Sequence, residues 1–331
     1  MTLAFSQPEA VVGETITVQK VDHTTVLGSR QRKTTLEITL ECSLGDDFPV
    51  TLPNDVEIES VQVGGRDIPV LRKGQQLIVP VQPGAQVVKI NWRSGEVMET
   101  NIRPSTVSLP YESANISSAI HVPASRWVLW ADGPTRGPAV QFWVILIFAF
   151  LAALILGGIS FSPLGRLEWV LLVIGLTQVH IFPAMLVVGW LLLLGLRAKH
   201  DFSNLRDEAM NALQVALVVL TVISIGVLIA VVSEGLLGRP EMFIRGNGSH
   251  QHLLQWFQPR SDNALPQPLV ISTSVWVYRF LMLVWALWLA SALLRWLKLG
   301  WQAFSKDGYW RDSDKKMKRD EIIDATSVVE P

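Results

Sequence analysis

The sequence predicts a β plus membrane-α fold, in which an N-terminal antiparallel β-sandwich-like domain is followed by a polytopic transmembrane helical domain. Two patterns predict it. Over residues 1–135, apolar and polar side chains alternate in short runs separated by glycine and proline, which is the periodicity of strands. Over residues 138–297, apolar side chains instead gather in runs of about twenty or more, which is typical of membrane-spanning helices.

The composition excludes several classes of protein. Of the 331 residues, 49% are hydrophobic and 17% are charged, whereas a soluble domain carries roughly a quarter charged residues. Together with the apolar runs after Pro138, this composition excludes a wholly soluble, a disordered and a fibrous protein. The formal net charge of −1 also excludes a globally basic nucleic-acid-binding protein, so we expect no nucleic-acid partner.

Seven strands are predicted in the β domain, residues 1–135. Turn sequences such as Gly64-Gly65 and Pro83-Gly84 separate them, because glycine and proline supply the backbone angles that turns need. Short, evenly spaced strands without a helical pattern favour a sandwich, whose core is expected to include the single cysteine, Cys42. The predicted strands are Thr15–Lys20, Thr35–Cys42, Val56–Val63, Gln76–Val81, Val87–Trp92, Ile116–Val122 and Trp127–Trp130.

Four apolar segments are predicted to form the membrane domain, residues 138–297, and a polar cytoplasmic tail, residues 298–331, follows them. Each segment is long enough to cross a hydrocarbon core about 30 Å thick. Tryptophans near the ends of several segments indicate aromatic belts at the two membrane surfaces. The segments are about 139–161, 167–196, 209–232 and 269–294.

The distribution of basic residues predicts which side each loop faces. Short cytoplasmic flanks carry an excess of Lys and Arg, and Arg295 and Lys298 lie directly after the last segment. We therefore place the C-terminus and the link Arg197–Arg206 in the cytoplasm, and the loop Glu234–Ser272 outside. The predicted location is a cell inner (plasma) membrane, which the chain crosses several times.

The second apolar segment leaves two topologies open. A single helix of about 30 residues would span roughly 45 Å and overshoot the membrane, and Pro183 in its middle is expected to kink or break it. One kinked span would give four crossings and a cytoplasmic β domain. A helical hairpin that enters and leaves on one side would place the β domain in the periplasm. Basic residues on both flanks, Arg166 and Arg197, favour the hairpin.

A candidate intramembrane polar site is formed by Gln178, His180 and Arg279. Gln178 and His180 lie at the break in the second segment and Arg279 lies within the fourth, and polar groups at membrane depth are often functional. They could bind a small ligand or pass a proton. The alternative, which we favour, is that Gln178 and His180 occupy a hairpin tip near water while Arg279 extends to the interface beside Trp276 and Tyr278.

The start of the chain predicts an origin within a longer protein. The first thirty residues contain no hydrophobic run that could serve as a signal peptide, and residues 2–12 are typical of a linker. Export of the β domain would then need a signal upstream. We therefore expect this chain to be the C-terminal part of a longer protein.

Two groups of residues resemble the C-terminal portion of large uncharacterised proteins of the bacterial cell envelope. One is Arg126–Pro134, shortly before the first apolar segment, and the other comprises Trp276–Arg279, Trp285–Trp288 and Arg295–Leu297. In those proteins a β-rich extracytoplasmic region precedes a small membrane domain. The resemblance includes no catalytic motif, and it implies an exported β domain and an origin within a longer chain.

No catalytic residues, cofactor or metal site are predicted. The sequence contains no phosphate-binding loop, nucleophile elbow or zinc-protease motif, and His250 and His252 have no third ligand nearby. The predicted function is a membrane anchor or assembly protein whose partners are the lipid bilayer and, through the β domain, a protein or envelope polymer. The alternatives are a transporter or channel component that uses the polar break, and a membrane-embedded enzyme acting on a lipid-linked substrate.

Overall fold

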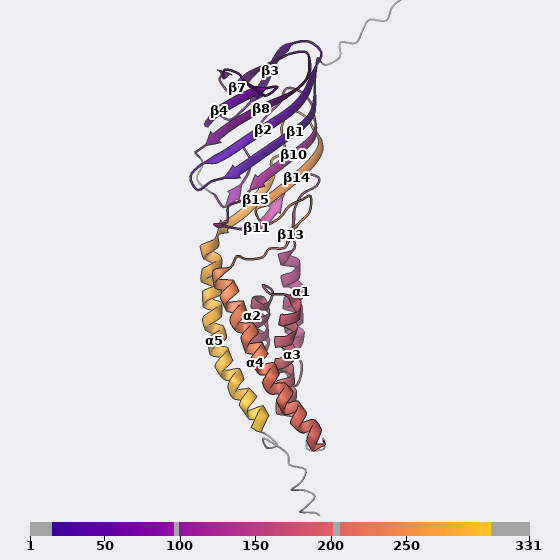
Figure 1. The fold of residues 1–331 in the computed structure, drawn as a ribbon, viewed down its shortest axis with the longest axis vertical. Coiled ribbons are helices and arrows are strands. Elements are labelled where there is room, and N and C mark those ends of the chain that lie inside the picture. Colours follow the sequence, from indigo (N-terminus) through magenta and orange to yellow (C-terminus); the bar gives the residue numbers. More distant parts are fainter. Residues whose placement is uncertain (1–14, 96–98, 201–205, 306–331) are drawn as a thin grey trace, which may run out of the picture. The chain divides into compact units, whose positions relative to one another are not determined.

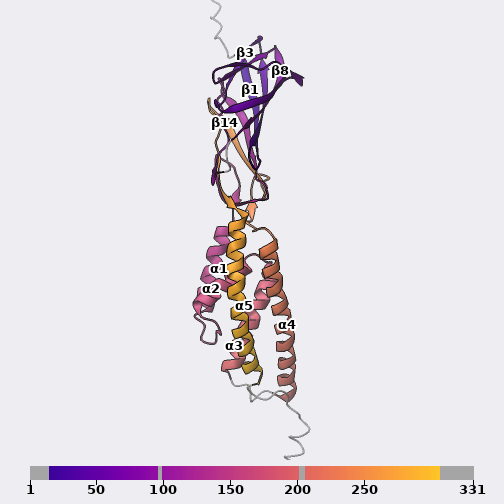
Figure 2. The same cartoon turned by 90° about the vertical axis from the view of Figure 1, so that its left-hand side faces the viewer.

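The computed structural model describes residues 15–95, 99–200 and 206–305, which form two compact units. The β unit comprises Met1–Gln141 and Met242–Val275, and the helical unit comprises Phe142–Glu241 and Trp276–Pro331. An N-terminal multi-sheet β domain is thus followed by long apolar helices, as the sequence predicts (Figure 1, Figure 2). The β unit, however, takes in a second stretch of chain from between the last two apolar segments.

A seven-stranded sheet forms the main layer of the β unit. All seven predicted strands are present in the structure, and β4 and β7 have the predicted bounds. The expectation of a wholly antiparallel sheet is wrong at one pair, because β10 lies parallel to β1 after a crossover through the intervening strands. In spatial order the strands are β14 (Leu253–Ser261), β10 (Ser113–His121), β1 (Ile16–Leu27), β2 (Arg32–Cys42), β8 (Gly84–Ser94), β4 (Val56–Val63) and β5 (Arg66–Asp67).

A three-stranded sheet covers part of the inner face of the main sheet. It consists of β3 (Asp46–Thr51), β7 (Gln76–Val81) and β6 (Leu71–Lys73). Leu36 and Ile38 of the main sheet and Phe48 of β3 belong to one core cluster, and each is 0% exposed. Alternate residues of β2 are buried, so the period-two pattern places the apolar side chains on the face between the sheets.

The stretch between the last two apolar segments supplies three strands to the β unit. Leu253–Ser261 is β14, which pairs with β10 along its whole length. The others form small sheets, β11 (Arg126–Asp132) with β15 (Leu269–Ser274) and β9 (Asn101–Ile102), and β12 (Ala139–Val140) with β13 (Ile244–Arg245). Residues 269–274 were expected to begin the fourth apolar helix. They form a strand instead, since β-branched residues dominate them and β11 offers an edge.

The described residues of the helical unit form five helices. They are α1 (Phe142–Leu156), α2 (Arg166–Leu176), α3 (Ile181–Lys199), α4 (Asp207–Leu237) and α5 (Val275–Ser305). Of these, α3, α4 and α5 are long and apolar enough to cross a membrane, and α1 is a shorter apolar helix. The protein therefore has the helices of a membrane-embedded protein.

The second apolar segment is broken where Gln178 and His180 lie, a few residues before Pro183. The gap between α2 and α3 falls at residues 177–180, and Pro183 lies in the first turn of α3. Proline is tolerated there because the first backbone N–H groups of a helix have no partner within it. The start of the predicted tail is also helical, since α5 continues to Ser305. The predicted linker, residues 2–12, and the rest of the tail lie outside the described residues.

Candidate functional site

The predicted polar residues of the second segment lie in the gap between α2 and α3. The side-chain Oε1 of Gln178 accepts a hydrogen bond of 3.1 Å from the backbone N–H of Glu241, just after α4. His180 is exposed and occupies the N-cap position of α3. Gln178 thus has a structural role, because it joins the tip of the α2–α3 pair to the end of α4.

Arg279 lies one turn into α5, which begins at Val275. Its Cζ atom is 5.0 Å from the centroid of the Trp276 ring, which is a cation–π distance. Its Nε atom is buried and has no hydrogen-bond partner among the described residues. Gln178 contacts Glu241 and Arg279 contacts Trp276, so neither contact joins the two candidate residues. The ligand or proton site at these positions stays a prediction.

Charged and polar contacts join the helix ends at one end of the helical unit. We call this end the basic end. It comprises residues 157–168, residues 197–200, Arg206 and the last turns of α5. Lys199 Nζ at the end of α3 donates to the carbonyl of Ser160 (2.5 Å), before α2. Arg295 on α5 pairs with Glu168 in the first turn of α2, with 2.9 Å between Nη2 and Oε1.

The opposite helix ends form the junction end, where the chain passes to the β unit at Phe142, Glu241 and Trp276. The contact between Gln178 and Glu241 lies there, and so does a close approach of α4 to α5. A Cβ atom built on Gly235 would lie 2.1 Å from the Met282 Cε atom, so the two helices touch at this position.

The two sets of contacts define the direction of each helix. Helices α1, α3 and α5 run from the junction end to the basic end, and α2 and α4 return. Helices α2 and α3 therefore form a hairpin, and Arg166 and Lys199 both lie at the basic end. This is the arrangement that the basic flanks of the second segment favour.

The charge at the two ends is unequal. Exposed basic side chains at the basic end are Arg166, Lys199, Arg206, Arg295 and Lys298. Glu168 offsets Arg295, and Glu208 lies 3.9 Å from Arg206, both measured between N and O atoms. Lysine and arginine in excess beside apolar helices are typical of the cytoplasmic side of a membrane protein.

A buried polar cluster in the β unit was not predicted from the sequence. It comprises His23, Thr25, Thr34, Trp92, Ser94 and Ser118, which face inward on four neighbouring strands and are 3% exposed or less. The His23 ring stacks on Trp92 with 6.1 Å between centroids. Neither ring nitrogen has a hydrogen-bond partner among the described residues. Burial lowers the pKa of His23 to about 4, so the imidazole is neutral at pH 7.

The signal for this cluster was present in the strand pattern. His23 and Thr25 occupy the alternating positions of β1 that otherwise hold Ile16, Val18 and Val21. A histidine on the inner face of a strand is consistent with a buried neutral side chain. The cluster contains no carboxylate or cysteine, and no group of three or more His, Cys, Asp or Glu side chains in the described part of the chain could hold a metal ion.

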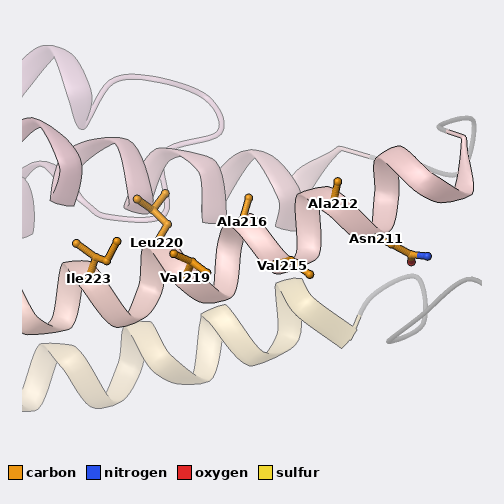
Figure 3. A pocket seen from close by; sticks show the side chains of 7 residues that line it. All are labelled: Asn211, Ala212, Val215, Ala216, Val219, Leu220 and Ile223. Atoms are coloured by element: carbon orange, nitrogen blue, oxygen red, sulfur yellow. The ribbon is translucent and has the colours of Figure 1, made fainter.

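An apolar hollow lies on one face of α4, close to the basic end. Figure 3 shows the side chains that line it, which come from this helix alone. They are Asn211, Ala212, Val215, Ala216, Val219, Leu220 and Ile223. The small side chains leave space between the larger ones. Such a surface suits hydrocarbon contact, but its shape alone identifies no occupant.

Comparison with known proteins gives structural matches only. No protein-family model and no curated protein matches the chain. The matching solved structures include M1 zinc metallopeptidase from Deinococcus radiodurans, with 13% identity and a TM-score of 0.27, covering 37% of this chain and 36% of that chain. Another is a two-domain M1 zinc metallopeptidase mutant bound to L-tryptophan, with 11% identity, a TM-score of 0.28, and coverage of 38% and 37%. The chain thus spans well under half the length of these peptidases, and scores this low establish no common fold or activity.

Proposed function

We propose that this chain is an integral inner-membrane protein that anchors a periplasmic β unit and presents it to a protein or envelope-polymer partner. One observation carries the proposal. Strands from before α1 and from between α4 and α5 build a single β unit, so the chain connects that unit to the helices three times. Three connections couple the β unit to the membrane segments more firmly than one flexible linker would.

The surface of the helices supports their placement in a bilayer. Large apolar side chains are exposed along α1, α4 and α5, among them Phe148 (68%), Val222 (67%) and Leu287 (66%). Water would disfavour so many exposed apolar side chains, whereas hydrocarbon solvates them well. Between their ends, the helices pair their own backbone N–H and C=O groups, as a bilayer requires.

Strand pairing and charge together support the periplasmic side for the β unit. Strands β10 and β14 pair with each other, so residues 113–121 and 253–261 lie on one side of any membrane that the helices cross. A single kinked span in place of the α2–α3 hairpin would put them on opposite sides. The basic residues lie at the helix ends away from the junction with the β unit, which favours a cytoplasmic basic end.

Cysteine labelling tests both the membrane assignment and the side. Cys42 is the single cysteine and is buried, so Cys42→Ser gives a background without reactive thiols. Lys73→Cys in an exposed part of β6 and Arg206→Cys at the basic end are then introduced separately. Cells with a permeabilised outer envelope are treated with a membrane-impermeant maleimide. We expect Lys73→Cys to react in intact inner membranes and Arg206→Cys to react only after lysis.

Two results would contradict the proposal. The reverse labelling pattern would place the β unit in the cytoplasm. Release of the protein from membranes by alkaline carbonate would show that it is not integral. Labelling of both variants after denaturation in detergent is the control for expression and thiol reactivity.

A further inference from the structure

A hollow lined by charged side chains lies on the β unit, beside the turn between β1 and β2. We call it the charged hollow. Its volume is about 450 Å³, within the roughly 300–1,000 Å³ of ordinary small-molecule sites. The turn and the strands β1, β2, β4 and β8 line it, with three cationic side chains and one carboxylate. The lining residues include Gly28, Arg30, Gln31, Lys33, Glu59 and Arg93.

The turn that forms one wall of the charged hollow has a fixed shape. The backbone N–H of Gly28 donates a hydrogen bond of 2.9 Å to the carbonyl of Gln31, which closes the turn. A Cβ atom built on Gly28 would lie 2.6 Å from the same carbonyl oxygen, so a larger residue could not keep this geometry. Arg30 is therefore presented from a closed turn rather than from an open loop.

A β-bulge in β4 supplies the carboxylate of the charged hollow. The pairing of β4 with β8 shifts between Ile58 and Ser60, so Glu59 is the extra residue of the bulge. Bulges redirect side chains and are frequent beside functional sites. The Glu59 carboxylate lies 2.9 Å from Lys33 Nζ and 3.5 Å from Arg93 Nε. It thus holds two of the three cationic side chains in place.

The third cationic side chain has no counter-charge. Arg93 also lies 3.2 Å from Glu57, measured between Nε and Oε2, so two carboxylates offset Lys33 and Arg93. Arg30 is exposed, and its guanidinium has no hydrogen bond or ion pair within the part of the chain that the structure describes. A guanidinium presents paired N–H donors that match the two oxygens of a carboxylate. The charge of the hollow is therefore complementary to one singly charged anionic group.

A row of small polar side chains crosses the main sheet next to the charged hollow. Strand register places Thr24 of β1 beside Thr35 of β2, which lies two residues from Lys33. Asn91 of β8 and Ser60 of β4 continue the row, which is about 14 Å long at 4.7–4.9 Å per strand. The Thr35 hydroxyl donates to Asn91 Oδ1 (2.7 Å), and Asn91 Nδ2 donates to Ser60 Oγ (2.9 Å). These hydrogen bonds fix the orientation of the polar groups.

The chemistry of this surface favours a polysaccharide over a protein segment. Hydroxyl and amide groups in a row can hydrogen-bond to sugar hydroxyls, directly or through bridging water. Tight protein interfaces depend instead on large aromatic or apolar anchors that fill fitted pockets. Val26 is the one large apolar side chain that lines the charged hollow, so an anchor of that kind has little to pack against.

We propose that the charged hollow binds a carboxylate-bearing polysaccharide. One carboxylate group lies in the hollow against Arg30, and the adjoining sugar residues extend along the row that contains Thr35 and Asn91. This inference deepens the proposed function, because it names the chemical class of the envelope polymer. It rests on that function to the extent that the β unit must lie outside the inner membrane to meet such a polymer.

Isothermal titration calorimetry of the full-length protein, purified in a non-ionic detergent, tests the proposal. The probes are oligogalacturonate, poly-L-glutamate of similar length and neutral dextran oligomers. We expect the wild-type protein to bind oligogalacturonate about tenfold more tightly than either of the others, because only this probe has both the carboxylates and the sugar hydroxyls. Added sodium chloride should weaken the binding, since salt screens attraction between exposed charges.

Arg30→Gln removes the unpaired charge and should weaken the binding of oligogalacturonate about tenfold. The residue is exposed in a turn and has no partner among the described residues, so the fold does not depend on it. Arg66→Gln is the matched control, because Arg66 is also exposed on the main sheet, in β5, but is outside the charged hollow. The two variants have the same net charge, and we expect Arg66→Gln to bind like the wild type.

Three outcomes would overturn the site. Failure of the wild-type protein to bind oligogalacturonate would show that the charged hollow does not take this class of ligand. Equal weakening by Arg30→Gln and Arg66→Gln would show a general attraction of charge without a site. Binding of poly-L-glutamate as tight as that of oligogalacturonate would assign the hollow to an acidic protein segment. The titrations use detergent solution, where both sides of the protein are accessible, so their failure is distinct from failure of the labelling experiment.

Discussion

Acidification from pH 7 to pH 4 is expected to lower the free energy of unfolding around His23 by about 3 kcal/mol. Burial lowers the pKa of this imidazole to about 4, against 6.5 for an ordinary histidine. Between these values the unfolded chain binds a proton that the folded β unit does not. The stability is therefore full above about pH 6.5 and is lost as the pH falls toward 4, because each pKa unit corresponds to about 1.4 kcal/mol.

Amide hydrogen exchange of the intact protein measures this loss locally. Peptides spanning β1 are compared across pH 4 to 7 after correction for the intrinsic exchange rates. In His23→Leu, which has a similar volume and no titratable group, we expect the pH dependence of β1 protection to be much smaller. The carboxylate of Glu59 changes in the same direction, since its hydrogen bond to Lys33, at 2.9 Å, holds its pKa below the ordinary value of a glutamate, so the comparison with His23→Leu is needed to separate the two groups. An equal pH dependence in wild type and His23→Leu would disprove the assignment.

The buried face of each strand was predictable because it depends on the alternation of side chains within the strand itself. In β2 every second residue from Arg32 to Cys42 is buried, and from Leu36 to Cys42 these buried residues are apolar and alternate with polar ones. A period of two over such a run has few interpretations other than a half-buried strand. The seven strands predicted on this basis are all present.

The strands after α4 were missed because their partners are distant in the sequence. β14 pairs with β10, and β15 pairs with β11 and with Ile102 of β9. The paired strands are not joined by hairpin turns that a sequence pattern could predict. Leu269–Ser274 also continues directly into the apolar helix α5. Hydropathy does not distinguish an apolar strand from the apolar helix that follows it. The sequence therefore predicted this strand as the start of the apolar segment.

The break in the second segment was predicted from Gln178, His180 and Pro183, but proline is not the residue at which the helix stops. Pro183 was the obvious breaker, but a helix start accommodates proline, and the chain breaks three residues earlier. Helix α2, which ends just before the gap, packs on α5. Trp285 Nε1 donates to the carbonyl of Leu171 (2.7 Å) on α2, and the indole ring lies against Gly175. Neither contact can be read from residues 167–196 alone.

Gly175→Val is expected to destabilise the helical unit strongly. A Cβ atom at this position would lie 1.9 Å from Trp285 Cζ2, so the valine and the indole cannot both keep their places. Overpacking of this kind costs about 1–3 kcal/mol, and more where the neighbour is a fixed ring. Trp285 is 7% exposed and its indole N–H donates a hydrogen bond to the carbonyl of Leu171, so the ring has little room to move. Thermal unfolding of the detergent-purified protein should show a midpoint several degrees below that of the wild type.

Gly189→Val provides the matched control, because it makes the same chemical change within α3 where a Cβ atom meets nothing within 4 Å. A valine costs at least as much helix propensity at Gly189, in the middle of α3, as at Gly175 near the end of α2, so a lower midpoint for Gly175→Val reports the contact with Trp285. In a Trp285→Leu background the ring is gone, and Gly175→Val should then cost much less than it does alone. Equal midpoints for the two valine variants, or an undiminished cost in the Trp285→Leu background, would show that α2 does not pack on α5 as described. That packing holds one helix of the α2–α3 hairpin against α5.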